Sequence, residues 1–221
     1  MIQPELKAYR RCSDRHVLVL ETNLTYVEKC QIFHYAVLVR KAGNELTGIM
    51  KKRYDQLVRT KRYRKLKSLY KRYKDADNKK ALKDVCDQMK EMQKQYDVTW
   101  DYCRTSMIPI GKKYGIDAVF ALTKAEDVFR GIEKCLYSDG ETVHFKKRGD
   151  LPCIRAKQIN RGIIMKQMNF KFKNIEFGVN IKDRYEQEEV DAILYYLKHA
   201  EFMDSIAANT YKETDICVST Y

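Results

Sequence analysis

The chain has 221 residues, an apolar content of 44% and a formal net charge of +13, from 43 Lys and Arg against 30 Asp and Glu. The apolar fraction is that of a globular protein, and no apolar run approaches the roughly 20 residues of a membrane span, so disordered and membrane-integral proteins are excluded. The excess of base predicts a polyanionic partner, either nucleic acid or an acidic lipid surface.

The first part of the chain predicts one strand and then long helices. Residues 16–20 are an apolar, β-branched run, and we expect a strand there. From about residue 26 to residue 73 apolar side chains recur at helical spacing, and a polar break follows at 75–78. A second stripe then repeats at coiled-coil spacing, at Leu82, Val85, Met89, Met92 and Tyr96. Two amphipathic helices joined by a short polar turn predict an antiparallel hairpin.

Residues 99–137 predict two further helices. Thr99 is the expected N-cap of a short helix that contains Trp100 and Met107 and that Pro109 and Gly111 interrupt. A later helix ends at a Ser-Asp-Gly turn, residues 138–140, and its apolar stripe is Ala121, Ala125, Val128, Ile132 and Leu136.

The apolar period changes after residue 140. Residues 170–173 and 175–181 alternate between apolar and polar, which predicts half-buried strands, and 216–220 alternate again. The acidic stretch 186–203 predicts a helix. The expected fold class is therefore α+β, with a helical unit between an N-terminal strand and C-terminal strands. If those strands share one small sheet or antiparallel barrel, the helical unit is an insertion into it.

The sequence assigns no catalytic residue, no metal site and no cofactor. The seven cysteines are widely spaced, without a CxxC pair or a Cys/His cluster, which argues against structural zinc. The first residues contain no secretory signal, so we expect reduced thiols and a cytoplasmic protein. A carboxylate cluster could bind a divalent ion but fits a polar helix face better: Glu186, Glu188, Glu189 and Asp191.

The positive charge lies in two blocks. Residues 41–74 carry a net charge of +11 and residues 144–173 a net charge of +8, whereas the rest of the chain is near neutral or acidic. In the first block the tyrosines and leucines form the inward stripe, so the cations project outward and can follow a phosphate backbone. A merely solvated helix face is the alternative, and it would mix acids with the bases. The candidate residues are Lys51, Lys52, Arg53, Arg59, Lys61, Arg62, Arg64, Lys67, Lys71 and Arg72.

The second block is expected to be a loop or irregular connector. Exposed loops with glycine can approach phosphates closely, and a solvated connector is the alternative. The candidate nucleic-acid-binding residues here are Lys146, Lys147, Arg148, Arg155, Lys157 and Arg161.

Short motifs follow one another in a characteristic order over residues 40–165. They are Ala42-Gly-Asn-Glu-Leu46, Arg53-Tyr-x-x-Leu57, Lys61-x-Tyr-Arg-Lys-Leu66, Tyr114-Gly-Ile-Asp117, Val143-His-Phe-Lys-Lys-Arg-Gly149 and Arg155-Ala-Lys157. Their order and character resemble the N-terminal half of TnpB-like proteins, transposon-encoded RNA-guided nucleases related to compact type V CRISPR effectors.

The resemblance implies a β-barrel wedge domain interrupted by a helical recognition domain. Residues 1–25 would begin the wedge, residues 26–140 would form the recognition domain, and residues 141–221 would supply a basic connector and the remaining wedge. The implied function is to grip guide RNA and the guide–target heteroduplex and to read a flanking DNA motif. The implied partners are guide RNA, target DNA and a RuvC-like nuclease portion, in a prokaryotic or mobile-element-encoded cytoplasmic protein.

The sequence departs from the family pattern in one respect. It has neither a RuvC-like strand–Asp motif nor CxxC pairs, so Mg²⁺ is expected only in a nuclease portion outside this chain. Whether the chain belongs to an enzyme stays open, and it would be a fragment, a split subunit or a degenerate member. The alternative is a phage- or mobile-element-encoded interaction or inhibitor protein. It would bind a protein partner through the 82–96 stripe or an acidic face at 183–204.

Overall fold

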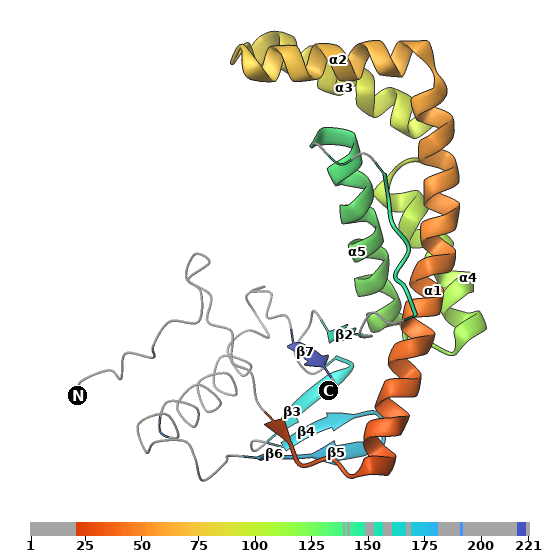
Figure 1. Ribbon diagram of the computed structural model, residues 1–221, viewed down its shortest axis with the longest axis vertical. Coiled ribbons are helices and arrows are strands. Elements are labelled where there is room, and N and C mark those ends of the chain that lie inside the picture. The colour runs from red at the N-terminus through yellow and green to blue at the C-terminus, as the bar shows by residue number, and fades with distance from the viewer. Residues whose placement is uncertain are drawn as a thin grey trace. The chain divides into compact units, whose positions relative to one another are not determined.

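A computed structural model describes residues 21–138, 140, 142–148, 153–156, 161–166, 169–180, 191 and 216–219 (Figure 1). The α+β class is confirmed. The strand expected at 16–20 lies outside the described residues, as does most of the helix expected at 186–203. The elements in chain order are β1 (Glu21–Thr22), α1 (Tyr26–Arg59), α2 (Lys61–Asp75), α3 (Lys79–Gln95), α4 (Trp100–Tyr114), α5 (Ala118–Tyr137), β2 (Cys153–Ala156), β3 (Ile163–Lys166), β4 (Asn169–Phe172), β5 (Ile175–Phe177), β6 (Val179–Asn180) and β7 (Ile216–Ser219).

The chain forms two compact units. One contains β1, the start of α1 through Ile32, and strands β3 to β6. The other contains α1 from Phe33 onward, helices α2 to α5, residues 142–148, β2 and β7, apart from one terminal residue of each of these two strands. None of the described helices is long and apolar enough to cross a membrane.

The first unit holds a three-stranded antiparallel sheet in the order β3-β4-β5. Phe172 of β4 and Phe177 of β5 are buried, and the side chains next to them on these strands are exposed or half-buried, so strands in these stretches are confirmed. The run predicted at 175–181 is two short strands, because it breaks at Gly178 and β6 pairs with β1. The sheet is open, because β3 and β5 are its edges and do not pair with each other. The described strands therefore do not show the expected barrel.

A strand that precedes the helices pairs with a strand that follows them. Glu21 of β1 lies opposite Asn180 of β6, and Asn23 extends the pairing through hydrogen bonds with the backbone N–H and C=O of Gly178. In chain order, the helical segment thus lies between two strands that pair with each other.

The predicted helical stretch 26–73 is two helices that meet at Thr60. A capping box starts α1: the Thr25 N–H donates to Glu28 Oε2 at 2.8 Å, and the Glu28 N–H donates to Thr25 Oγ1 at 3.4 Å. Thr60 then leaves helical geometry and caps α2 by accepting from the N–H of Tyr63 at 3.3 Å. The chain changes direction at this point, and α2 runs away from α1 (Figure 1).

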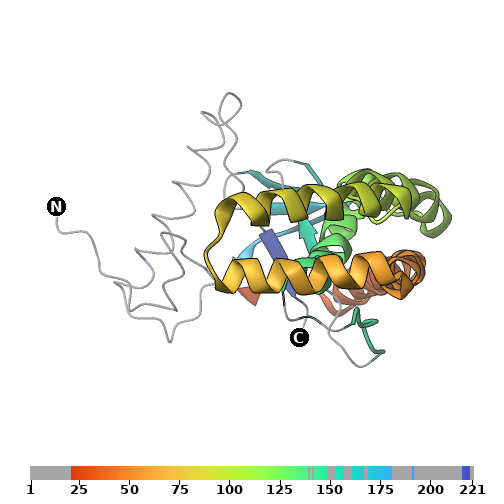
Figure 2. The ribbon, with the colours of Figure 1, turned by 90° about the horizontal axis from the view of Figure 1, so that it is seen from above.

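Helices α2 and α3 form the predicted hairpin. Figure 2 shows them running side by side, and they turn at the polar break, where Asp77 adopts a positive φ of 48°. Asn78 caps α3 by accepting from the N–H of Ala81 at 3.2 Å. Tyr63 and Leu66 of α2 are buried, as are three residues of the predicted α3 stripe, Val85, Met89 and Met92.

The predicted interruption at Pro109 and Gly111 is wrong. Thr99 is the N-cap, as expected, but α4 continues to Tyr114 and ends at Gly115, which is left-handed with φ 63°. Gly111 is buried, and a Cβ there would lie 3.2 Å from the Cβ of Ala121 on α5. The glycine thus permits α4 and α5 to approach closely. This packing keeps α4 helical at the turn where Pro109 removes a backbone hydrogen bond. The stripe predicted for α5 is buried throughout.

We expect Pro109→Ala to stabilise the protein. Pro109 is exposed inside α4, where it removes one helical hydrogen bond, and alanine restores the N–H without touching the buried face. Urea denaturation should show a free energy of unfolding higher by about 1–2 kcal/mol, after the entropy that alanine returns to the unfolded chain is subtracted. Ile108→Ala, at an exposed neighbour, should change it by less than about 0.5 kcal/mol. A destabilised Pro109→Ala variant would contradict this account.

Candidate nucleic-acid interface

Helix α2 carries eight basic residues and a single acid, Asp75. Burial of Tyr63 and Leu66 directs the cations toward solvent. Seven of them are exposed, and no described residue forms an ion pair with them. These seven, which we call the α2 basic face, are Lys61, Arg62, Arg64, Lys65, Lys71, Arg72 and Lys74.

The partner helix α3 has a different charge pattern at similar exposure. It carries five lysines and three acids, and two of the lysines form ion pairs one turn apart: Lys90 with Asp87 at 3.4 Å and Lys94 with Glu91 at 3.0 Å. Helix α2 also contains like-charged pairs one turn apart, for example Lys61 and Lys65, and among the described residues no ion pair offsets them. Such like-charged pairs destabilise a helix by a few tenths of a kcal/mol each, so α2 carries an unfavourable charge that a polyanion would relieve.

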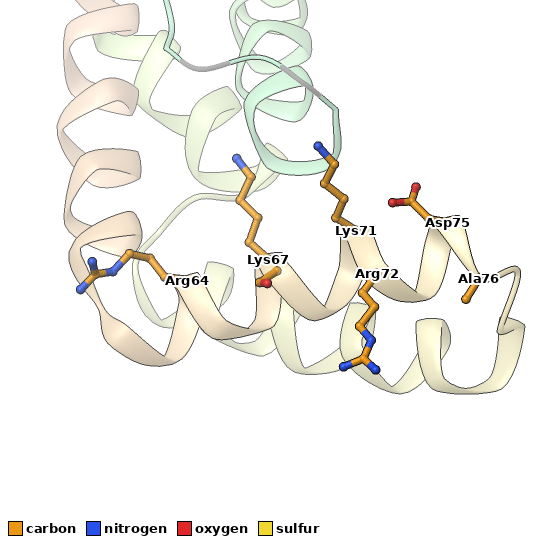
Figure 3. Close-up of a pocket in the computed structure, with 7 residues that line it drawn as sticks. Arg64, Lys67, Lys71, Arg72, Asp75 and Ala76 are labelled. Carbon is orange, nitrogen blue, oxygen red and sulfur yellow. The ribbon is translucent and has the colours of Figure 1, made fainter.

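The surface of α2 contains a shallow groove of about 720 Å³. Figure 3 shows that Lys67, Lys71 and Asp75 project from one side of the helix, whereas Arg72 projects from the opposite side. The cations therefore spread around the solvent-facing half of α2 and do not form a single line. This arrangement suits contact with phosphates on both sides of the helix.

Three residues predicted from the first basic block are bound within the protein. Lys67 Nζ donates to the carbonyl oxygen of Cys135 at 2.6 Å, in the last turn of α5. Lys51 Nζ donates to Thr142 Oγ1 at 2.9 Å, and Arg53 donates to the Tyr102 hydroxyl at 3.3 Å while its guanidinium lies over that ring. These side chains join helices and segments of the helical unit. Lys52 and Arg59, by contrast, are exposed on α1.

Residues 142–148, which we call the strap, lie along α1 in the opposite direction. Asn44 brackets Lys146, accepting from its N–H at 2.9 Å and donating to its carbonyl at 2.9 Å. One turn earlier on α1, Arg40 Nη1 donates to the carbonyls of Lys147 at 2.8 Å and Arg148 at 2.6 Å. Because residues 146–148 of the strap are held through their backbone, the three basic side chains Lys146, Lys147 and Arg148 are exposed.

The rest of the second block is divided among different elements. Arg155 was expected in a loop, but it lies in strand β2, is half-buried and forms an ion pair with Asp127 at 2.6 Å. Its strand geometry follows from the pairing of β2 with β7, a segment far away in the sequence. Arg161 is exposed just before β3, and Lys157 lies outside the described residues.

Sequence reasoning missed four residues of the interface described above. Lys65 and Lys74 belong to the first basic block and are exposed on α2, so their charge and helical position were sufficient to identify them. Arg40 and Asn44 were not identifiable in this way, since their partners are more than 100 residues distant in the chain. Within the described part of the chain, no group of three or more His, Cys, Asp or Glu side chains is arranged to hold a metal ion.

Comparisons with protein-family models, with curated proteins and with solved structures found no match for this chain. The charge and geometry of the interface itself therefore indicate what the chain can bind.

The hydrogen bonds from Arg40 to the strap should protect the strap from proteolysis. Arg40→Ala removes both Arg40 hydrogen bonds to the strap, so the strap should detach from α1 more often, and trypsin should cleave after Lys147 and Arg148 about tenfold faster. Mass spectrometry of timed digests measures the rate. Lys41→Ala is the matched control, because Lys41 is an exposed neighbour that makes no such bond, and its digest should match the unmodified protein. Equal acceleration in both variants would show that Arg40 does not hold the strap.

Proposed function

We propose that the chain binds the phosphate backbone of a structured RNA or an RNA–DNA heteroduplex, as the recognition part of a TnpB-like RNA-guided DNA endonuclease. One observation carries the proposal: the α2 basic face holds seven exposed cations without ion-pair partners among the described residues, beside a helix in which two of five lysines are paired with acids. Counterion release on contact with phosphates would make such binding favourable and strongly dependent on salt.

The dimensions of α2 fit an extended contact. Its 15 residues span about 22 Å, long enough to meet several successive phosphates of a helical backbone. The helix ends in a tight turn and is packed on one side, so it presents a rigid, preformed surface. A rigid array of cations recognises helical shape and leaves sequence reading to base pairing.

The chain order supports the family part of the proposal. The β1–β6 pairing encloses the helical segment between strands, as expected for a recognition domain inserted into a wedge domain. The exposed cations of the strap and Arg161 would then contact guide RNA or the flanking DNA duplex. Cleavage and its Mg²⁺ would belong to a RuvC-like portion acting in cis or in trans.

The alternative of a protein-binding module receives less support. Its proposed contact was the apolar stripe at 82–96, and the central residues of that stripe, Val85, Met89 and Met92, are buried in the hairpin. The other proposed contact, the acidic face at 183–204, lies outside the described residues apart from Asp191.

Filter binding with a structured RNA, over a range of salt concentrations, tests the proposal. Replacing five residues of the α2 basic face by Gln (Lys61, Arg64, Lys65, Lys71 and Arg72) should weaken binding at low salt. The slope of log affinity against log salt should fall by up to about 3.5 to 4.5, at roughly 0.7–0.9 for each of five lost phosphate contacts.

The control removes the same charge from the other helix of the hairpin. Lys79, Lys80, Lys83, Lys90 and Lys94 of α3 are all exposed, and changing them to Gln lowers the net charge equally. This variant should keep most of the slope. Equal losses in the two variants would indicate diffuse attraction, and a flat salt response of the unmodified protein would refute nucleic-acid binding.

A further inference from the structure

A second basic groove lies where the strap meets α1, in the same unit as α2 but formed by different residues. Its volume is about 460 Å³. Helix α1 contributes Val37, Arg40, Lys41 and Asn44, and the strap contributes Lys146 and Arg148. Four of the six lining residues are cationic, and no carboxylate is present among the described residues that line the groove.

Arg40 is held in place before any ligand arrives. Its Nη1 donates to two strap carbonyls, at 2.8 and 2.6 Å, which leaves the N–H groups of Nη2 and Nε as its remaining donors. A guanidinium fixed in this way loses little freedom when it binds an anion, and its planar fork matches the oxygens of a phosphate. Asn44 holds the strap from the next turn, so the same bonds that dock the strap build the groove wall.

Four like charges that converge on one groove repel one another unless an anion shares them. The strap nevertheless brings Lys146 and Arg148 toward Arg40 and Lys41, and its docking bonds use the backbone and not these side chains. The positive side chains of the strap thus line the groove although the hydrogen bonds that hold the strap on α1 do not involve them.

We infer that this groove is a phosphate-binding site, distinct from the α2 basic face, that holds the phosphate group of a nucleotide or of a nucleic-acid strand. Arg40 orients the phosphate through its fixed guanidinium, and Lys41, Lys146 and Arg148 neutralise its charge. The volume accommodates more than the phosphate alone, so a nucleotide-sized group can enter. The inference does not require that α2 binds RNA.

Isothermal titration calorimetry with inorganic phosphate and with AMP tests the site. Saturable one-to-one binding is expected for both. The double variant Lys41→Gln/Arg148→Gln removes two charges and leaves the strap bonds in place, since Arg148 contributes only its carbonyl to them. It should weaken binding at least tenfold, because hydrogen bonds to charged groups are the strong ones. Absence of saturable binding to both probes would overturn the inference.

A charge-matched control separates a built site from general attraction. Lys79→Gln/Lys80→Gln lowers the net charge by the same amount at exposed positions on α3, far from the strap in the sequence, and should leave phosphate affinity unchanged. Equal weakening by this pair would also overturn the inference. Circular dichroism of each variant confirms that the helices are retained.

Two further probes identify the source of the phosphate. A short single-stranded RNA with a 5′-phosphate is compared with AMP and with the same RNA bearing a 5′-hydroxyl. Tighter binding of the phosphorylated RNA than of AMP assigns the site to a strand end, and equal binding assigns it to a free nucleotide. Identical binding of the two RNAs, with no competition by AMP, would refute the site.

The α2 five-Gln variant makes the two proposals independent. If the groove binds phosphate as inferred, this variant should bind AMP normally even while it loses its salt-dependent affinity for structured RNA. Loss of AMP binding in the α2 variant would mean that the two surfaces are one site, and the inference of a separate groove would fail.

Discussion

The burial of Tyr63 and Leu66 against α3 is the constraint on which the candidate interface depends. A 15-residue helix with eight cations has no strong reason to fold by itself, since its like charges repel. Burial of the Leu66 side chain, worth about 2 kcal/mol, and of the Tyr63 ring, whose buried hydroxyl has no hydrogen-bond partner among the described residues, offsets that repulsion. It also determines which way the helix faces, so the cations point outward because the tyrosine and leucine point inward.

One carbonyl group is shared by three helices of the helical unit. The oxygen of Cys135, in the last turn of α5, accepts from the hydroxyl of Tyr54 on α1 at 3.2 Å and from Lys67 on α2 at 2.6 Å. The final carbonyls of a helix lack partners within the helix and carry partial negative charge, so a lysine and a hydroxyl suit this position. Burial raises the pKa of Tyr54 to about 12, and the hydroxyl therefore remains a donor throughout the physiological range.

The strap is also held by polar side chains that form hydrogen bonds with the backbone of another segment. Arg40 and Asn44 form hydrogen bonds with the strap backbone, so the neighbouring lysine and arginine side chains of the strap remain exposed to solvent. In both regions some polar side chains hold two segments together by hydrogen bonds, and others remain exposed to solvent. Membership of a basic block did not distinguish the two roles: Lys67 and Lys71 are one turn apart on α2, yet Lys67 is bound to α5 while Lys71 is exposed.

The local pattern of residues determined most of the helices, the strands and the distribution of charge. Apolar period, capping residues and charge density predicted the α2–α3 hairpin, the α5 stripe, the alternating strands and the two basic blocks, because each depends on neighbours within a few residues. Tertiary structure decided the rest. Gly111 permits α4 to continue because Ala121 packs against it, Arg155 became a strand residue through pairing with a distant segment, and Arg40 met the strap across 107 positions of sequence. These outcomes depend on contacts between segments far apart in the chain, and no local pattern of residues contains that information.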